Sequence, residues 1–157
     1  MNLADDSRIW IFQANRKFST EEKDIIISKL KNFIADWNAR GDLLLMRNLY
    51  TDASACYDSI PKLFPGHTLE DEILMRKASI AKAQNDETAM ISYLQEIEDR
   101  FSYDIFADKA IFSLAEYYEK KNDIEKAKEK YKKLLLDYPN SMYSQTARTK
   151  YRELERK

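Results

Sequence analysis

The chain has 157 residues, enough for one domain or a short repeat array with a substantial core; 44% are hydrophobic and 34% are charged. Two Gly and three Pro are too few for an all-β protein, which needs a tight turn about every 8–12 residues, so the composition indicates helix. The 26 Lys and Arg nearly balance the 27 Asp and Glu, which gives no electrostatic reason to expect nucleic acid or an anionic membrane as a partner.

The first residues, MNLADDSRIWIFQ, lack the basic start and long apolar run of a secretion signal. No stretch of the chain approaches the ~18 apolar residues of a membrane-spanning helix. We therefore expect a soluble cytoplasmic protein, with a periplasmic location still open if a leader has been removed. The single cysteine, Cys56, cannot form an internal disulfide.

Residues 1–18 are expected to form an extended N-terminal segment. It contains four consecutive apolar residues, two of them β-branched and two aromatic: Ile9, Trp10, Ile11 and Phe12. Such a run is typical of a buried strand, yet no second strand is apparent in the chain. The four residues must therefore be covered either by the rest of the chain or by the same segment of a second molecule, since an unpaired strand edge is a template for association.

A helix is expected over residues 19–40. Ser19, with Glu22 three residues later, forms a capping box. Apolar residues then recur at helical spacing as far as Arg40: Ile26, Ile27, Leu30, Phe33, Ile34 and Trp37. The second half of this helix could also be the first helix of a repeat, so two assignments of the segment remain open.

An internal repeat with a period of 37 residues follows. Four columns of mostly apolar residues match in three copies: Ala53, Met90 and Ala127; Tyr57, Leu94 and Tyr131; Ile60, Ile97 and Leu134; and Phe64, Phe101 and Tyr138. Within each copy the steps are four, three and four residues, the apolar stripe of an amphipathic helix. Asn48, Asn85 and Asn122 precede these helices, where a short polar side chain suits a turn.

Each repeat has another helix ahead of this stripe. In the last full copy it is expected at 107–120, and its marked positions in the third, second and first copies are Ile111, Leu114, Ala115 and Tyr118; Leu74, Ala78 and Ala81; and Trp37, Gly41 and Leu44. Gly41, Ala78 and Ala115 hold the place where the two helices of a repeat should approach closely. A larger side chain there would force the helices apart.

This arrangement resembles the tetratricopeptide repeat, whose pattern is W-x2-L-G-x2-Y, then A-x3-F and a terminal Pro. The third copy fills every patterned place with Ile111, Leu114, Ala115, Tyr118, Ala127, Tyr131, Leu134 and Pro139. The second copy departs from the pattern, with Lys77 at the leucine place and Ser102 at the proline place. The resemblance runs from about residue 34 to the C-terminus and implies an all-α, TPR-like scaffold that binds a protein or peptide.

The predicted organisation is three helical hairpins and a cap, at residues 34–70, 71–107, 108–141 and 142–157. The cap has an apolar stripe of Ala147, Tyr151 and Leu154, with charged residues on its other faces. The long period and the Tyr-Pro-Asn-Ser junction at 138–141 look like those of bacterial repeats found in envelope-assembly and cell-division accessory proteins.

Residues 6–41 also resemble the start of a small bacterial family often labelled ABC transporter ATPase. That resemblance implies a transport-linked protein that uses a nucleotide. However, the chain has no G-x-x-x-x-G-K-[ST] loop to cradle a phosphate. A fused or truncated fragment of a larger repeat protein would account for both resemblances.

No pattern for catalysis is apparent in the sequence. His67, the only histidine, falls in a predicted turn without a nucleophile motif or an orienting acid. One His and one Cys cannot form a closed zinc site of four ligands. We therefore expect a non-enzymatic scaffold with no cofactor and no metal.

Function is then expected to come from the concave surface, which the first helix of each hairpin lines. On the face away from the core stripe these helices carry Asn38, Leu45, Met75, Ser79, Lys82, Phe112, Glu116 and Glu119. Met75 and Phe112, if exposed, suit the capture of an amphipathic helix or extended peptide. Alternatively, the N-terminal segment covers both.

The apolar run in residues 1–18 leads us to expect a homodimer, because symmetric dimers are the commonest homo-oligomers and a two-fold strand pair would bury this run. Light scattering on the intact chain and on a chain lacking residues 1–17 tests this expectation. The intact chain should be a dimer and the shortened chain a monomer. A monomeric intact chain, or a dimer that survives the deletion, would contradict it.

Overall fold

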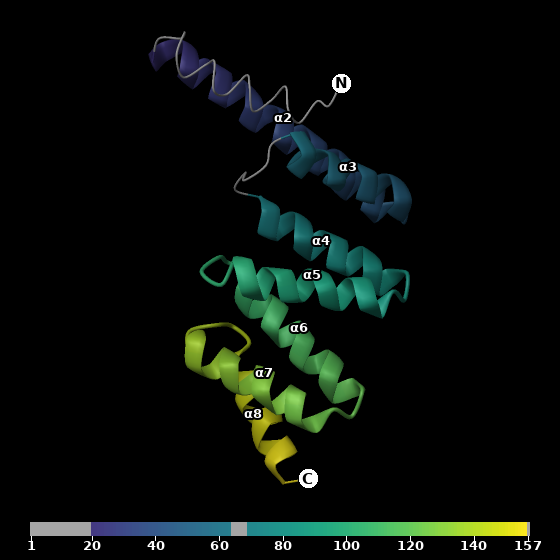
Figure 1. Cartoon of the computed structure of the whole chain (residues 1–157), viewed down its shortest axis with the longest axis vertical. Coiled ribbons are helices and arrows are strands. Elements are labelled where there is room, and N and C mark those ends of the chain that lie inside the picture. The colour runs from purple at the N-terminus through teal and green to yellow at the C-terminus, as the bar shows by residue number, and fades with distance from the viewer. Residues whose placement is uncertain (1–19, 64–68, 157) are drawn as a thin grey trace. The chain divides into compact units, whose positions relative to one another are not determined.

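The computed structural model describes residues 20–63 and 69–156 (Figure 1). These ranges form seven helices and no strand: α2 (Thr20–Met46), α3 (Tyr50–Leu63), α4 (Glu70–Ala83), α5 (Glu87–Arg100), α6 (Ala107–Lys120), α7 (Ile124–Asp137) and α8 (Ser144–Glu155). The predicted all-α, TPR-like fold is confirmed. The expected extended segment, with Ile9, Trp10, Ile11 and Phe12, lies outside the described residues, as does His67.

The chain divides into two compact units, Met1–Ile73 and Leu74–Lys157, and the boundary between them falls inside α4. The first unit contains α2, α3 and the first turn of α4. The second unit contains the rest of α4 and the four helices that follow it.

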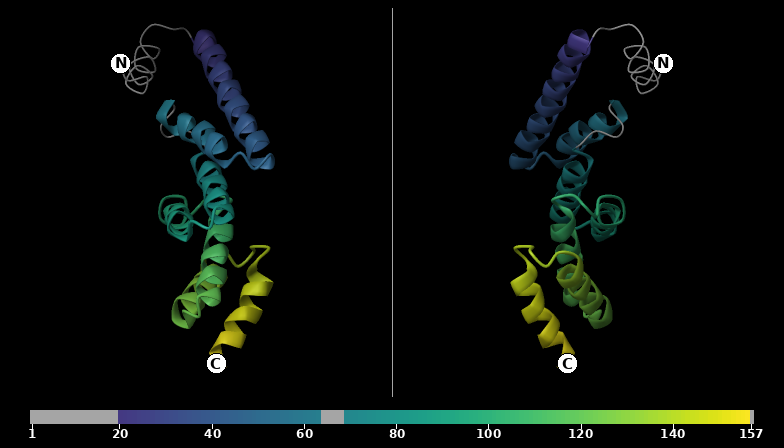
Figure 2. Two further views of the ribbon diagram at one scale, coloured as in Figure 1. Left: turned by 90° about the vertical axis from the view of Figure 1, so that its right-hand side faces the viewer. Right: turned by 90° about the vertical axis from the view of Figure 1, so that its left-hand side faces the viewer.

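In the first unit, α2 and α3 pack against each other. Helix α2 is one unbroken helix that continues through Gly41 and runs on beyond α3 (Figure 2). A Cβ atom on Gly41 would lie 2.5 Å from Cε1 and 2.8 Å from Cζ of the Tyr57 ring. Tyr57 is fully buried and its hydroxyl donates to Oδ1 of Asp42 at 2.5 Å, so the ring cannot move aside. The predicted close approach of two helices at Gly41 is confirmed.

The three turns marked by asparagine share one backbone geometry. Asn48, Asn85 and Asn122 have φ angles of 59°, 59° and 60°, in the left-handed region that asparagine tolerates better than most residues. Each asparagine N–H bonds the carbonyl three residues back, and the next N–H bonds the carbonyl five back, as from Asp86 to Ala81. This is the Schellman ending of a helix.

Two of these turns also begin the next helix. The carboxylate of Asp86 accepts a hydrogen bond from the N–H of Ala89 at 3.0 Å, and that of Asp123 accepts one from Lys126 at 3.3 Å. The Asn-Asp pair therefore ends one helix with its first residue and caps the next helix with its second. This double role explains why the Asn-Asp pair recurs 37 residues apart in the second and third copies, whereas Leu49 follows Asn48 in the first copy.

Two apolar clusters form the core of the second unit. One joins α4, α5 and α6 through Met75, Ala78, Ala81, Met90, Leu94, Ile97, Ala110 and Leu114. The other joins α6, α7 and α8 through Ile111, Phe112, Ala115, Ala127, Tyr131, Leu134, Ala147 and Leu154. Helix α6 is buried on both sides, since it contributes to each cluster. Neighbouring repeats thus complete each other's core, as in other repeat proteins.

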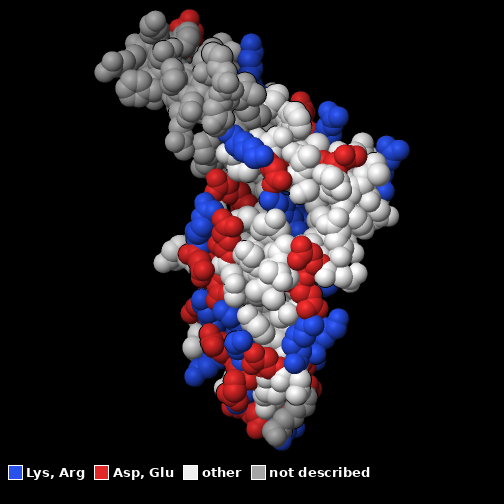
Figure 3. Space-filling model, turned by 45° about the vertical axis from the view of Figure 1, so that its right-hand side comes forward, with Lys and Arg blue, Asp and Glu red and all other residues white. Residues whose placement is uncertain are grey.

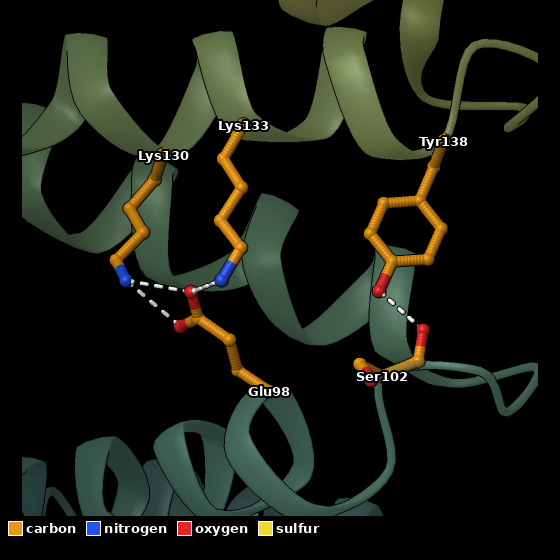
Figure 4. Close-up of polar contacts among 5 residues, drawn as sticks. All are labelled: Glu98, Ser102, Lys130, Lys133 and Tyr138. Carbon is orange, nitrogen blue, oxygen red and sulfur yellow. Dashed lines mark hydrogen bonds and ion pairs between the residues drawn. The ribbon is translucent and has the colours of Figure 1, made fainter.

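Polar contacts also link α5 to α7 (Figure 4). Glu98 is 6% exposed, and its carboxylate lies 2.8 Å from Nζ of Lys130 and 2.7 Å from Nζ of Lys133. The hydroxyl of Tyr138 donates to the carbonyl of Ser102 at 2.5 Å, a bond that a proline at this place could also accept. Burial acts to raise the pKa of Glu98, but the hydrogen bonds from the two lysines outweigh it and hold that pKa below its usual value.

Lys77, at the leucine place of the second repeat, is the other departure from the pattern besides Ser102. A contact with an aromatic ring accommodates its charge. Its ammonium group lies 4.8 Å from the ring centroid of Tyr93 on α5, within the range of a cation–π contact. The ammonium group therefore lies at the edge of the first cluster, while the aliphatic part of the side chain is partly buried.

Helix α8 closes the second cluster as the predicted cap. It buries Ala147 and Leu154, and Oγ of Ser144 donates to the carbonyl of Tyr138 at 3.0 Å. Most of its remaining residues are exposed.

On the face seen in Figure 3, acidic and basic side chains are interspersed. In the described part of the chain, no helix is long and apolar enough to span a membrane.

Ala115 provides a test of the helix packing. It is fully buried in the second cluster, so Ala115→Leu should overpack the site and lower the free energy of unfolding by about 1–3 kcal/mol in chemical denaturation. Ala83→Leu, at an exposed position of α4, is the matched control and should change stability little. Equal stability of the Ala115→Leu variant and the parent would contradict the packing described here.

Glu98 predicts a pH-dependent contribution to stability. Because its folded pKa lies below the ordinary value of 4.5, its contribution is present above that value and is lost as the pH falls through the folded pKa. Glu98→Gln should therefore lower the unfolding free energy by about 1–2 kcal/mol at pH 7, and this difference should shrink at acidic pH. Glu129→Gln, an exposed position on α7, should show neither effect. A difference that is the same at both pH values would show that the charge of Glu98 is not responsible.

Candidate functional site

A groove of about 430 Å³ opens in the second unit between α4, the first half of α5, and α6. It is lined by Met75, Ala78, Ser79, Lys82, Asn85, Glu87, Met90, Leu94, Lys109, Ser113, Glu116, Tyr117 and Lys120. Helices α4 and α6 are the first helices of two successive hairpins, and such helices line the concave surface of repeat arrays.

The floor of the groove is apolar and belongs to the core. Met75, Met90 and Leu94 are 7%, 9% and 2% exposed and lie in the first cluster with Ala78. Each is held by neighbours on α4, α5 and α6, so the floor is already formed before any ligand arrives. A preformed surface reduces the conformational entropy lost on binding.

The rim of the groove is polar and exposed. The side chains of Ser79, Lys82, Lys109, Glu116 and Lys120 stand at the edges of α4 and α6. The hydroxyl of Ser79 donates to the carbonyl of Met75 one turn earlier, at 3.0 Å. The groove therefore pairs an apolar floor with a rim that can make hydrogen bonds and ion pairs.

Glu87 ties the α4–α5 turn to the C-terminal end of α6. Its carboxylate lies 2.7 Å from Nζ of Lys121 and accepts a hydrogen bond from the Tyr117 hydroxyl at 3.2 Å. The hydrogen bond from Lys121 is the largest effect on the pKa of Glu87 and lowers it, against a smaller effect of desolvation. Lys82 is in the last turn of α4 and Lys120 is the last residue of α6. This link therefore places both lysines at the same end of the groove, and Lys109, in the first turn of α6, lies at the other end.

Four of the eight predicted groove residues line this groove, namely Met75, Ser79, Lys82 and Glu116. Glu119 lies elsewhere: its carboxylate accepts a hydrogen bond from the Tyr131 hydroxyl at 2.8 Å and one from Nζ of Lys150 on α8 at 3.0 Å. Asn38 and Leu45 are on α2, in the first unit.

Of the two alternatives for Met75 and Phe112, the structure rules out exposure, because both side chains are buried. Met75 is 7% exposed and forms part of the floor, while Phe112 is 9% exposed in the second cluster. The ring of Phe112 stacks on Tyr143 with centroids 4.7 Å apart and meets Tyr131 edge-on at 6.0 Å. Tyr143 precedes α8, so the cap is what covers this face of α6 within the second unit.

The sequence interpretation did not identify several groove residues: Asn85, Glu87, Ser113, Tyr117 and Lys120. Those on α6 could have been found, because residues 109, 113, 116 and 120 follow one face of a helix. Glu87 could not, since it reaches the groove only through the turn that precedes α5. Among the described residues, no group of three or more His, Cys, Asp and Glu side chains could hold a metal ion.

Comparison with known proteins supports one family. Residues 109–141, which hold all but the start of α6, all of α7 and the junction after it, match the family model of the tetratricopeptide repeat. Comparison with curated proteins gives no match. The matched residues coincide with the third predicted repeat, and the same Asn-marked turn recurs in the two preceding hairpins. The chain is therefore a tetratricopeptide-like helical repeat protein.

Proposed function

We propose that the chain is a protein-interaction scaffold, and that its second unit binds a peptide segment of a partner protein in the groove between α4 and α6. The observation that carries this proposal is the apolar floor of Met75, Met90 and Leu94 beneath an exposed polar rim. Domains of this family bind proteins or peptides, and their first helices line the binding surface.

The chemistry of the groove suits a peptide. Burying one aliphatic or aromatic side chain on an apolar floor contributes ~1.5–3 kcal/mol. The rim then offers the Ser79 and Ser113 hydroxyls, the Asn85 amide and the charged groups for hydrogen bonds with the peptide backbone and its polar side chains. An apolar anchor with convergent polar groups is the usual composition of a specific binding site.

Substitution of Met75 or Phe112 by Glu would not test the proposal, because both side chains lie in core clusters. A carboxylate at either place would be buried without a partner, and such a change disrupts folding. Ser79 is the better position, since it is exposed and its hydroxyl bonds only within its own helix.

The test uses peptides selected on the intact chain from a random peptide display library. Ser79→Trp places a large ring at the rim and should weaken binding of the selected peptides about tenfold or more, as measured by isothermal titration calorimetry, with unchanged circular dichroism. The matched control is Thr149→Trp on α8, an exposed hydroxyl residue that also donates to the carbonyl four residues back, at 3.2 Å. A library that yields no binders, or binders indifferent to Ser79→Trp, would contradict the proposal.

A further inference from the structure

The three lysines at the rim of the groove form no ion pair with a described residue, although the charge of Lys120 acts on the carboxylate of Glu87. Lys82, Lys109 and Lys120 are exposed, and none of their ammonium groups lies within ion-pair distance of a carboxylate there. By contrast, six other lysines of the second unit do reach a carboxylate: Lys121, Lys126, Lys128, Lys130, Lys133 and Lys150. Three cations without an ion pair therefore border one groove, while Lys132, Arg148 and Arg152, which also form none among the described residues, lie on α7 and α8.

The acidic residues near the groove do not cancel this charge. The carboxylate of Glu87 is bound by Lys121 and Tyr117, and that of Glu119 by Lys150 and Tyr131. At the rim, Glu116 is the one carboxylate that forms no hydrogen bond or ion pair with a described residue, although its charge acts at longer range on Lys150. Three ammonium groups therefore face one carboxylate, which favours an acidic ligand.

The lysines stand at the two ends of the groove, with the apolar floor between them. Lys109 and Lys120 are eleven residues apart on α6, which corresponds to about 16 Å along a helix that rises about 1.5 Å per residue. An extended peptide advances about 3.3 Å per residue, so carboxylates four or five residues apart would reach both ends. Glu116, between the lysines along α6, disfavours a carboxylate in the middle of the ligand.

We propose that the ligand of the groove is an internal peptide segment in which one apolar side chain lies between two acidic residues about four positions apart. This inference rests on the proposed function and names the chemistry of its partner. The apolar side chain packs on Met75, Met90 and Leu94, and the two carboxylates pair with Lys109 at one end and with Lys82 and Lys120 at the other. Because methionine adapts its shape to its neighbours, the floor accepts leucine, methionine or phenylalanine.

The proposed ligand pairs with the lysines through two side-chain carboxylates and needs no free C-terminal carboxylate. The probe is therefore the heptapeptide Gly-Asp-Ser-Leu-Ser-Glu-Gly, acetylated at its N-terminus and amidated at its C-terminus. Two further peptides serve as references: one has lysine in place of Asp and Glu, and the other has serine in place of Leu. Fluorescence anisotropy on the intact chain measures all three.

The acidic peptide should bind, the lysine peptide should not, and the serine peptide should bind about tenfold or more weakly, because it has no apolar side chain to bury. Affinity for the acidic peptide should fall as ionic strength rises. Each of Lys82→Gln, Lys109→Gln and Lys120→Gln should weaken binding about two- to fivefold, the value of one exposed ion pair.

A control with the same change in net charge separates the groove from the charge of the whole protein. The triple variant Lys82→Gln, Lys109→Gln, Lys120→Gln should lose the acidic peptide. The triple variant Lys132→Gln, Arg148→Gln, Arg152→Gln alters three exposed cations on α7 and α8 and should retain it. Equal loss in both triple variants would overturn the inference, because binding would then depend only on net charge.

Two other outcomes would also overturn it. Peptides selected from the display library that lose binding in Ser79→Trp but are rich in Lys and Arg would refute the acidic ligand and leave the proposed function intact. Binding of the acidic peptide only to a chain lacking residues 1–17 would show that the chain's own N-terminal segment, and not a partner, occupies the groove. A library without any groove-dependent binder would instead refute the proposed function itself.

Discussion

Burial of α6 on two sides is the constraint on which the second unit depends. Ala110 and Leu114 face the cluster shared with α4 and α5, while Ile111 and Ala115 face the cluster shared with α7 and α8. A helix with two packed faces has only a narrow strip left for ligands. In α6 that strip carries Lys109, Ser113, Glu116 and Lys120. The core therefore determines both where the groove lies and which side chains border it.

Small residues make this double burial possible. Ala78, Ala115 and, in the first unit, Gly41 let the two helices of a hairpin approach closely, as the contact of Gly41 with the Tyr57 ring shows most directly. The same approach brings Met75, Met90 and Leu94 into one surface. The floor of the groove is thus a consequence of packing, and a ligand would meet a surface whose shape is already set.

Charge is arranged differently between helices and at the groove. Between α5 and α7, Glu98 is buried and neutralised by two lysines, an arrangement that joins successive hairpins. At the groove, Lys82, Lys109 and Lys120 remain exposed and form no ion pair with a described residue. Removing one partner of a buried ion pair destabilises the fold, whereas an unpaired ammonium group at a groove is available to a ligand.

The sequence alone determined the helical hairpins, their period and their turns, because these depend on local patterns. The apolar stripe through Leu94 and Ile97, the turns at Asn85 and Asn122, and the bounds of α6 were all readable from residue spacing, whereas the left-handed backbone of the two asparagines was found only in the structure. It also predicted that the first helices line the groove, and it named Met75, Ser79, Lys82 and Glu116 there.

Only the tertiary structure decided which polar and aromatic groups face one another. Phe112 has the spacing of a surface residue, but Tyr143 covers it because the chain turns back after α7. Glu119 has the same spacing, but its carboxylate accepts hydrogen bonds from Lys150 and Tyr131, which lie on other helices. A helical period states which face of a helix a residue occupies. It does not state which neighbour packs on that face, and burial, pairing and the charge left for a ligand all depend on that neighbour.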